Sequence, residues 1–125
     1  MKRITALLVV AALAISMFPL AAFAKSEAQE GMYGGYYYTA SLTSTKSSAT
    51  TRMTYVGSTK ILTRGTINYK NTTTGLAGSM SLAAPRQASS TSKTQPVPAN
   101  NNITYVSQDY CVSTTRVTTI AFNVT

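Results

Sequence analysis

Tyrosine is the residue type in this chain that is best suited to contact a partner. Tyr33, Tyr36, Tyr37 and Tyr38 are four of its eight tyrosines, and they flank a Gly-Gly pair. A tyrosine combines a flat apolar ring with a polar hydroxyl, so it can stack on a sugar ring or lie at a membrane surface. Alternation along a strand would place Tyr36 and Tyr38 in the core. We therefore expect Tyr33 and Tyr37 to be the ligand-binding tyrosines.

A second set of candidate binding residues is cationic. Lys60, Arg64 and Lys70 share one face of a predicted strand over residues 60–70, and apolar side chains alternate with them. An exposed row of cations attracts anionic polymers, acidic glycans or lipid headgroups, and screening weakens this attraction as salt rises. Positive charge also keeps small domains soluble, which is the alternative reading of the same residues.

The residues needed for catalysis are largely missing from the sequence. The chain has no histidine, which excludes Ser-His-Asp and Cys-His nucleophiles and removes the commonest metal ligand. Asp109 is the one acid in the predicted sheet, because Glu27 and Glu30 precede it, so a paired-carboxylate mechanism has no second group. The sequence predicts a protein that is not an enzyme and that uses no cofactor or metal ion.

Cys111 is the single cysteine of the chain and cannot form an internal disulfide. Its position in an apolar strand pattern suits a small buried residue. The alternative is an intermolecular disulfide that joins two copies of the chain.

The N-terminal 24 residues have the pattern of a cleaved signal peptide. Lys2 and Arg3 precede an apolar stretch at residues 4–20, and Ala22-Phe23-Ala24 matches the small-x-small cleavage pattern. We expect residues 1–24 to be removed, the mature chain to begin at Lys25 and the protein to be secreted. Loss of two cations lowers the net charge from +8 to +6. An exported chain with scattered cations is not expected to bind nucleic acid.

The mature chain has the composition and patterning of one small β domain. From Lys25 onward it has 13 Ser and 20 Thr, and Thr favours strands. We expect a flexible lead at residues 25–35, a single domain at residues 36–125 and a long loop at residues 85–101. Period-2 alternation predicts about six antiparallel strands, at residues 36–43, 49–56, 60–70, 76–84, 103–112 and 117–124. The fold class is all-β, as a small antiparallel sandwich or barrel.

Three features resemble those of small secreted β-sandwich proteins of Gram-positive bacteria. They are the signal peptide, the strand at residues 64–70 that runs into the turn at residues 71–75, and the aromatic-bearing final strand at residues 117–124. The named family that they resemble is the lactococcin 972-like bacteriocins. The chain departs from that family in its long loop, its cysteine and its lack of histidine and tryptophan. The resemblance implies action on the envelope of a target cell through binding of a wall precursor.

These observations lead to two functional expectations. The first is a secreted, basic, non-enzymatic protein that binds a cell-wall polymer or glycan, with Lys60, Arg64, Lys70, Tyr33 and Tyr37 as its binding residues and with peripheral membrane contact as a variant. The second is a structural or adhesive surface protein. Such a protein would assemble into homo-oligomers through strand edges or through Cys111.

Overall fold

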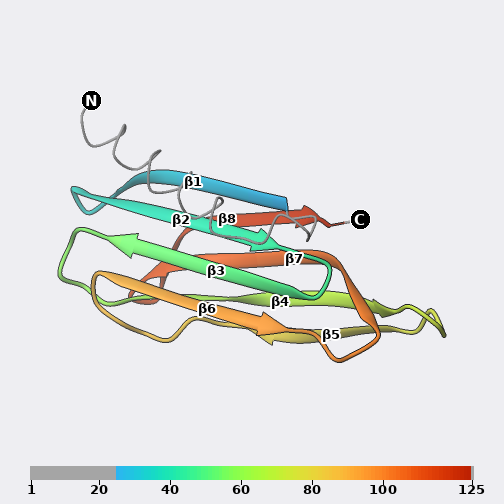
Figure 1. The fold of residues 1–125 in the computed structure, drawn as a ribbon. Helices are drawn as coiled ribbons and strands as arrows, with labels where there is room; N and C mark the ends of the chain where they lie inside the picture. Colours follow the sequence, from blue (N-terminus) through green and yellow to red (C-terminus); the bar gives the residue numbers. More distant parts are fainter. Residues whose placement is uncertain (1–24, 125) are drawn as a thin grey trace.

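The protein is a β-sandwich of two four-stranded antiparallel sheets (Figure 1). A computed structural model describes residues 25–124. Sheet A has the strand order β1-β2-β3-β6, and sheet B has the order β5-β4-β7-β8. The strands are β1 (Lys25–Tyr33), β2 (Tyr36–Ser44), β3 (Ser48–Tyr55), β4 (Ile61–Asn71), β5 (Ala77–Leu82), β6 (Ser90–Pro96), β7 (Asn101–Val112) and β8 (Thr115–Asn123). The predicted signal peptide lies outside the described residues. Within them, no helix is long and apolar enough to cross a membrane.

Successive strands run in opposite directions, which divides the connections between two ends of the sandwich (Figure 1). The connections β1–β2, β3–β4, β5–β6 and β7–β8 lie at one end. We call it the tyrosine end, because the first of these connections joins Tyr33 to Tyr36. Lys25 and Val124 lie at the opposite end, where the Nζ atom of Lys25 donates to the Asn123 carbonyl at 2.9 Å.

The core lies between the inward faces of the two sheets. Alternation predicted these faces correctly: Leu42 and Met53 of sheet A are fully buried, as are Ile61 and Ile67 of sheet B. In the final strand, Ile120 and Phe122 also point inward. Because two distinct sheets enclose this core, the structure confirms the all-β class and identifies its form as a sandwich.

Two strands were not predicted from the sequence, so the sandwich has eight strands instead of about six. Residues 25–33, expected as a flexible lead, pair with β2 over the whole of β1. Residues 90–96, expected within the loop at residues 85–101, pair with β3 as β6. Both are edge strands with mostly exposed side chains. Backbone pairing forms such strands without an alternating apolar pattern, which is why the pattern did not reveal them.

Two of the hairpins depend on turn residues that the sequence displays. Gly34 and Gly35 have φ values of 60° and 83°, which suits a two-residue turn with positive φ at both positions. Between β4 and β5, the Oδ1 atom of Asn71 accepts hydrogen bonds from the backbone N–H groups of Thr73 and Thr74, at 2.9 and 2.8 Å. The predicted hairpin at residues 60–84 is thereby confirmed.

A line of buried polar groups crosses the middle of the core. The Tyr110 hydroxyl donates to the Ser41 carbonyl at 2.7 Å and accepts from the Thr51 hydroxyl at 3.1 Å, so it links β7 to both central strands of sheet A. Burial raises the pKa of Tyr110, and the phenol therefore stays neutral. Beside it, the Nε2 atom of buried Gln108 donates to the Leu82 carbonyl at 2.7 Å.

Gly65 makes room for this polar line. A Cβ atom at position 65 would lie 1.9 Å from the Ser107 carbonyl oxygen and 2.4 Å from the Nε2 atom of Gln108. The backbones of β4 and β7 could not approach this closely around a larger residue. Gly65 is therefore required by a close approach of two strands.

We predict that Tyr110→Phe destabilises the fold by about 1–3 kcal/mol, because the buried Ser41 carbonyl and Thr51 hydroxyl lose their shared partner. Urea unfolding followed by circular dichroism measures this change. Tyr105→Phe is the matched control, because Tyr105 is half-buried and pairs with Asn68 outside the core cluster. Equal unfolding midpoints for wild type and Tyr110→Phe would contradict a stabilising role for this hydroxyl.

Candidate functional site

The connections of the tyrosine end are bonded to one another through their backbones. The Val56 N–H donates to the Tyr37 carbonyl at 3.0 Å, which joins the β3–β4 connection to the β1–β2 hairpin. The Tyr55 N–H donates to the Ser89 carbonyl at 2.8 Å, and the Ser113 N–H donates to the Lys60 carbonyl at 2.8 Å. All four connections therefore belong to one continuous surface.

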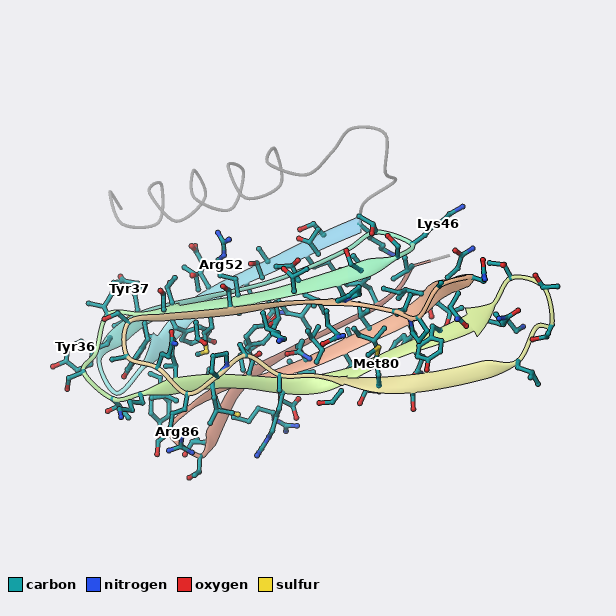
Figure 2. The ribbon with its side chains drawn as sticks, turned by 60° about the horizontal axis from the view of Figure 1, so that its bottom comes forward. Tyr36, Tyr37, Lys46, Arg52, Met80 and Arg86 are labelled. Carbon is teal, nitrogen blue, oxygen red and sulfur yellow. The ribbon has the colours of Figure 1, made fainter. Side chains whose placement is uncertain are left out.

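Large apolar and aromatic side chains are exposed on this surface. The exposed fractions are 56% for Met32, 37% for Tyr33, 50% for Tyr36 and 68% for Val56. Tyr37 is half-buried and pairs with Met32 across the hairpin. Figure 2 shows Tyr36 and Tyr37 together at this end of the molecule.

Tyr55 supports the exposed tyrosines from below. Its hydroxyl donates to the Tyr33 carbonyl at 2.8 Å. Its ring meets the Tyr36 ring edge to face, with centroids 6.1 Å apart and planes at 80°. Tyr38 is buried, as predicted, but the prediction of a core position for Tyr36 was wrong. Tyr36 is the first residue of β2, directly after the turn, and its side chain extends beyond the core cluster.

Three cations lie at the same end. Lys60 ends the β3–β4 connection, Arg86 lies in the β5–β6 connection, and Arg116 is the second residue of β8; all three are exposed. Figure 2 places Arg86 at the same end of the sandwich as Tyr36. Sequence reasoning did not group Arg86 and Arg116 with Lys60, because the three residues are far apart in the chain.

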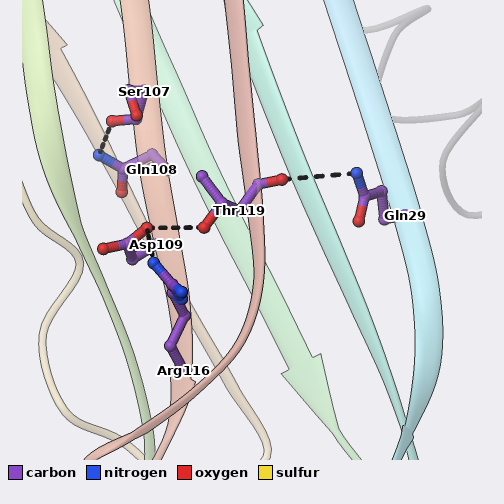
Figure 3. A network of polar contacts seen from close by, with 6 residues as sticks. All are labelled: Gln29, Ser107, Gln108, Asp109, Arg116 and Thr119. Carbon is purple, nitrogen blue, oxygen red and sulfur yellow. Dashed lines mark hydrogen bonds and ion pairs between the residues drawn. The ribbon is translucent and has the colours of Figure 1, made fainter.

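The acid nearest to these cations is already engaged. The Oδ1 atom of Asp109 accepts a hydrogen bond from the Thr119 hydroxyl at 2.7 Å and lies 3.9 Å from a guanidinium nitrogen of Arg116 (Figure 3). The Thr119 carbonyl in turn accepts a 3.5 Å contact from the Nε2 atom of Gln29, which connects β8 to β1 across the sandwich. Asp109 thus partly neutralises Arg116, whereas Lys60 and Arg86 have no ion-pair partner among residues 25–124.

The three cations predicted to form one row are separated in the structure. Lys60 precedes β4 and lies at the tyrosine end, whereas Arg64 and Lys70 occupy the outer face of β4, as expected. Arg64 pairs in register with Asp109. Lys70 is six residues further along the strand, about 20 Å away. Of the predicted binding residues, the structure brings together Lys60, Tyr33 and Tyr37.

Lys70 lies beside an open hollow of about 560 Å³ on sheet B. The hollow is lined by Asn68, Tyr69, Lys70, Ala77, Gly78, Ser79 and Thr104. It contains a single charged side chain, so it lacks the combination of cations and exposed apolar groups found at the tyrosine end.

Cys111 is fully buried, in agreement with one of the two alternatives expected from the sequence. It lies outside the main core cluster and pairs in register with Leu62 and Arg116. Burial raises the pKa of the Cys111 thiol. Arg64 and Arg116 act in the opposite direction, whereas Asp109 adds to the rise. A buried, protonated thiol is poorly placed to form a disulfide with another chain.

Comparison with family models, with curated proteins and with solved structures gives no match to this chain. The resemblance to lactococcin 972-like bacteriocins therefore stays a prediction. Among residues 25–124, no three His, Cys, Asp or Glu side chains lie close enough together to hold a metal ion.

We predict that a thiol reagent such as 5,5′-dithiobis(2-nitrobenzoate) labels Cys111 slowly in the native protein and quickly after unfolding in urea. The physical reason is that both access and thiolate formation require the strand to open. Labelling is followed by absorbance, with free glutathione as the reference for an exposed thiol. Rapid stoichiometric labelling of folded protein, or a covalent dimer in non-reducing gels, would contradict this expectation.

Proposed function

We propose that this protein is a secreted, non-enzymatic binding protein that attaches to an anionic component of a bacterial cell envelope through its tyrosine end. One observation carries the proposal: exposed aromatic and aliphatic side chains meet three cations on a single surface built from four connections. Soluble domains rarely gather exposed apolar groups in this way unless the patch contacts a partner.

The chemistry of this end suits a partner that presents both negative charge and apolar surface. Anionic groups are attracted over a range of several ångströms by the three cations, Lys60, Arg86 and Arg116. This attraction also orients the partner as it approaches. The tyrosines then provide ring surface with a polar hydroxyl at its edge. Polymers of a Gram-positive wall and the lipid headgroups beneath it both carry such negative charge, so the attachment is expected to weaken as salt rises.

A bacteriocin-like role is the sharper form of this proposal. Export through a signal peptide and attachment to a wall precursor would let the protein act on neighbouring cells without catalysis. The support for it is the sequence resemblance described above together with the sandwich fold.

Assembly through strand edges is a second candidate function. The edge strands β1, β6, β5 and β8 each leave one side without a strand partner among the described residues. Hydroxyl pairs on the outer face of sheet A, such as Thr50 with Thr94 at 2.8 Å, also form a regular surface. Concentration-dependent sedimentation tests this candidate, because edge pairing would give species larger than a monomer.

We predict that replacing Lys60, Arg86 and Arg116 together by Gln lowers affinity for isolated Gram-positive envelopes about 100-fold, since each cation near an anionic surface contributes about 1 kcal/mol. Co-sedimentation at several salt concentrations measures the effect, and the variant should also lose most of the salt dependence. The matched control replaces Lys46, Lys70 and Lys93 by Gln, which removes the same charge away from the tyrosine end. Equal losses in both variants would contradict a localised site.

We also predict that the chain from Lys25 onward, added to a panel of Gram-positive strains, inhibits growth of some strains and leaves others unaffected. Selective inhibition is expected because a wall-bound target differs between strains. The Lys60, Arg86 and Arg116 variant serves as the inactive control. Growth equal to that in buffer for every strain, at concentrations that saturate envelope binding, would remove the bacteriocin-like role and leave the binding function in place.

A further inference from the structure

The apolar exposure of the molecule is concentrated at one end. Residues 25–124 leave five large apolar or aromatic side chains exposed, and four of them are Met32, Tyr33, Tyr36 and Val56 at the tyrosine end. The fifth is Leu76, 72% exposed, in the β4–β5 hairpin at the opposite end. The exposed residues of the tyrosine end lie at the tip of a hairpin and in the connection bonded to it, where nothing else in the described chain covers them.

Two backbone carbonyls beneath these side chains accept hydrogen bonds from within the protein. The Tyr33 carbonyl accepts from the Tyr55 hydroxyl, and the Val56 N–H donates to the Tyr37 carbonyl. A peptide group that already has a partner can leave water at a much lower cost than one without. These two carbonyls therefore already have a hydrogen-bond partner when a surface covers the tip.

The geometry favours a hydrocarbon boundary over a sugar ring as the surface that meets this tip. Sugar stacking uses an open ring face with hydrogen-bonding groups beside it, whereas the neighbours of the exposed tyrosines at this tip include the aliphatic side chains of Met32 and Val56. Met32 and Val56 add no ring and no hydrogen-bonding group. Tyrosine with aliphatic neighbours is instead the combination found where a protein meets the headgroup region of a bilayer.

The cations of the same end determine which bilayer would be preferred. Lys60 and Arg86 lie in connections of the tyrosine end, and Arg116 is the second residue of β8 beside the β7–β8 connection, so all three cations lie at the end that carries the hairpin tip. Each basic residue near an anionic membrane strengthens binding about fivefold. A zwitterionic bilayer has no net negative charge, so the basic residues do not increase the affinity for it in this way.

We propose that the partner of the tyrosine end is an anionic lipid bilayer, into whose headgroup region Met32, Tyr36 and Val56 insert while Lys60, Arg86 and Arg116 hold the anionic headgroups. This inference rests on the proposed envelope-binding function and names its partner class. The sandwich stands on the membrane by one end, and Lys25 and Val124 point away from it.

The absence of tryptophan from the sequence allows a direct test of insertion. Val56→Trp places a unique fluorophore at the proposed inserting tip, and Leu76→Trp places one at an equally exposed position of the opposite end. With phosphatidylglycerol vesicles we expect the emission of Val56→Trp to shift to the blue and to be quenched by brominated acyl chains. Leu76→Trp should show neither effect, and phosphatidylcholine vesicles should give weaker binding.

Substitutions separate the apolar from the electrostatic contribution. The triple variant Met32→Ser, Tyr36→Ser, Val56→Ser should lose vesicle binding, whereas Leu76→Ser should retain it. The double variant Lys60→Gln, Arg86→Gln should bind phosphatidylglycerol vesicles about 25-fold more weakly. Lys46→Gln with Lys70→Gln is its charge-matched control. Unchanged urea midpoints show that each variant is folded.

The outcomes distinguish this inference from the function on which it rests. Binding to lipid-free cell walls without binding to phosphatidylglycerol vesicles would overturn the membrane partner and leave envelope binding intact, with a wall polymer as the ligand. Vesicle binding without a spectral shift in Val56→Trp would overturn insertion. Failure to bind either walls or vesicles would overturn both proposals.

Discussion

The Tyr110 hydroxyl is the point on which the arrangement of the two sheets depends. It crosses from β7 to the Ser41 carbonyl of β2 and receives the Thr51 hydroxyl of β3, so one side chain contacts three strands and both sheets. Apolar packing alone would allow the sheets to slide along each other, whereas a buried hydrogen bond has one favourable offset. Because that offset is fixed, the connections of sheets A and B lie side by side at each end. The candidate site is a consequence of this alignment, since its tyrosines come from sheet A and two of its cations border sheet B.

The high Ser and Thr content is compatible with the fold because most of those residues are exposed or half-buried, and the buried ones are Thr43, Ser44, Thr45, Thr51, Thr63 and Thr91. On sheet A, Ser26 pairs with Thr43 through their hydroxyls at 2.8 Å, and Thr39 pairs in the same way with Thr54. Such cross-strand pairs give each hydroxyl a hydrogen-bond partner within the sheet. Residues 25–124 therefore build a core without a disulfide, and Cys111 fills a buried position in sheet B near the charged side chains of Arg64, Asp109 and Arg116.

The sequence predicts the interior of this fold well and its edges poorly. Strands with one buried face show alternation, and residues 60–84 also show their turn. The strands β1 and β6 are exposed along most of their length, so nothing in their side chains marks them as strands.

Missing β6 had a consequence for the site. Each strand reverses the direction of the chain, so the number of strands between Lys60 and Arg116 decides whether the two residues lie at the same end. The six predicted strands place them at opposite ends, whereas the additional strand β6 places them at the same end. Sequence reasoning grouped Lys60 with Arg64 and Lys70 because alternation placed them on one strand face, and it had no means of bringing Arg86 and Arg116 to the same end as Lys60.

The exposed tyrosines are held in place by glycines that leave room for their buried neighbours. A Cβ atom at position 57 would lie 2.5 Å from the Tyr55 ring, and one at position 31 would lie 2.6 Å from the Tyr38 hydroxyl. Each glycine thus lets a tyrosine ring lie flat across an adjacent backbone. Tyr55 uses this position to support Tyr36 and the carbonyl of Tyr33. Exposed aromatic groups on a small domain carry a risk of aggregation, and a support of this kind limits it by fixing their orientation. The contacts of Tyr55 also restrict Tyr36, and a restricted side chain loses less conformational entropy when it meets a partner.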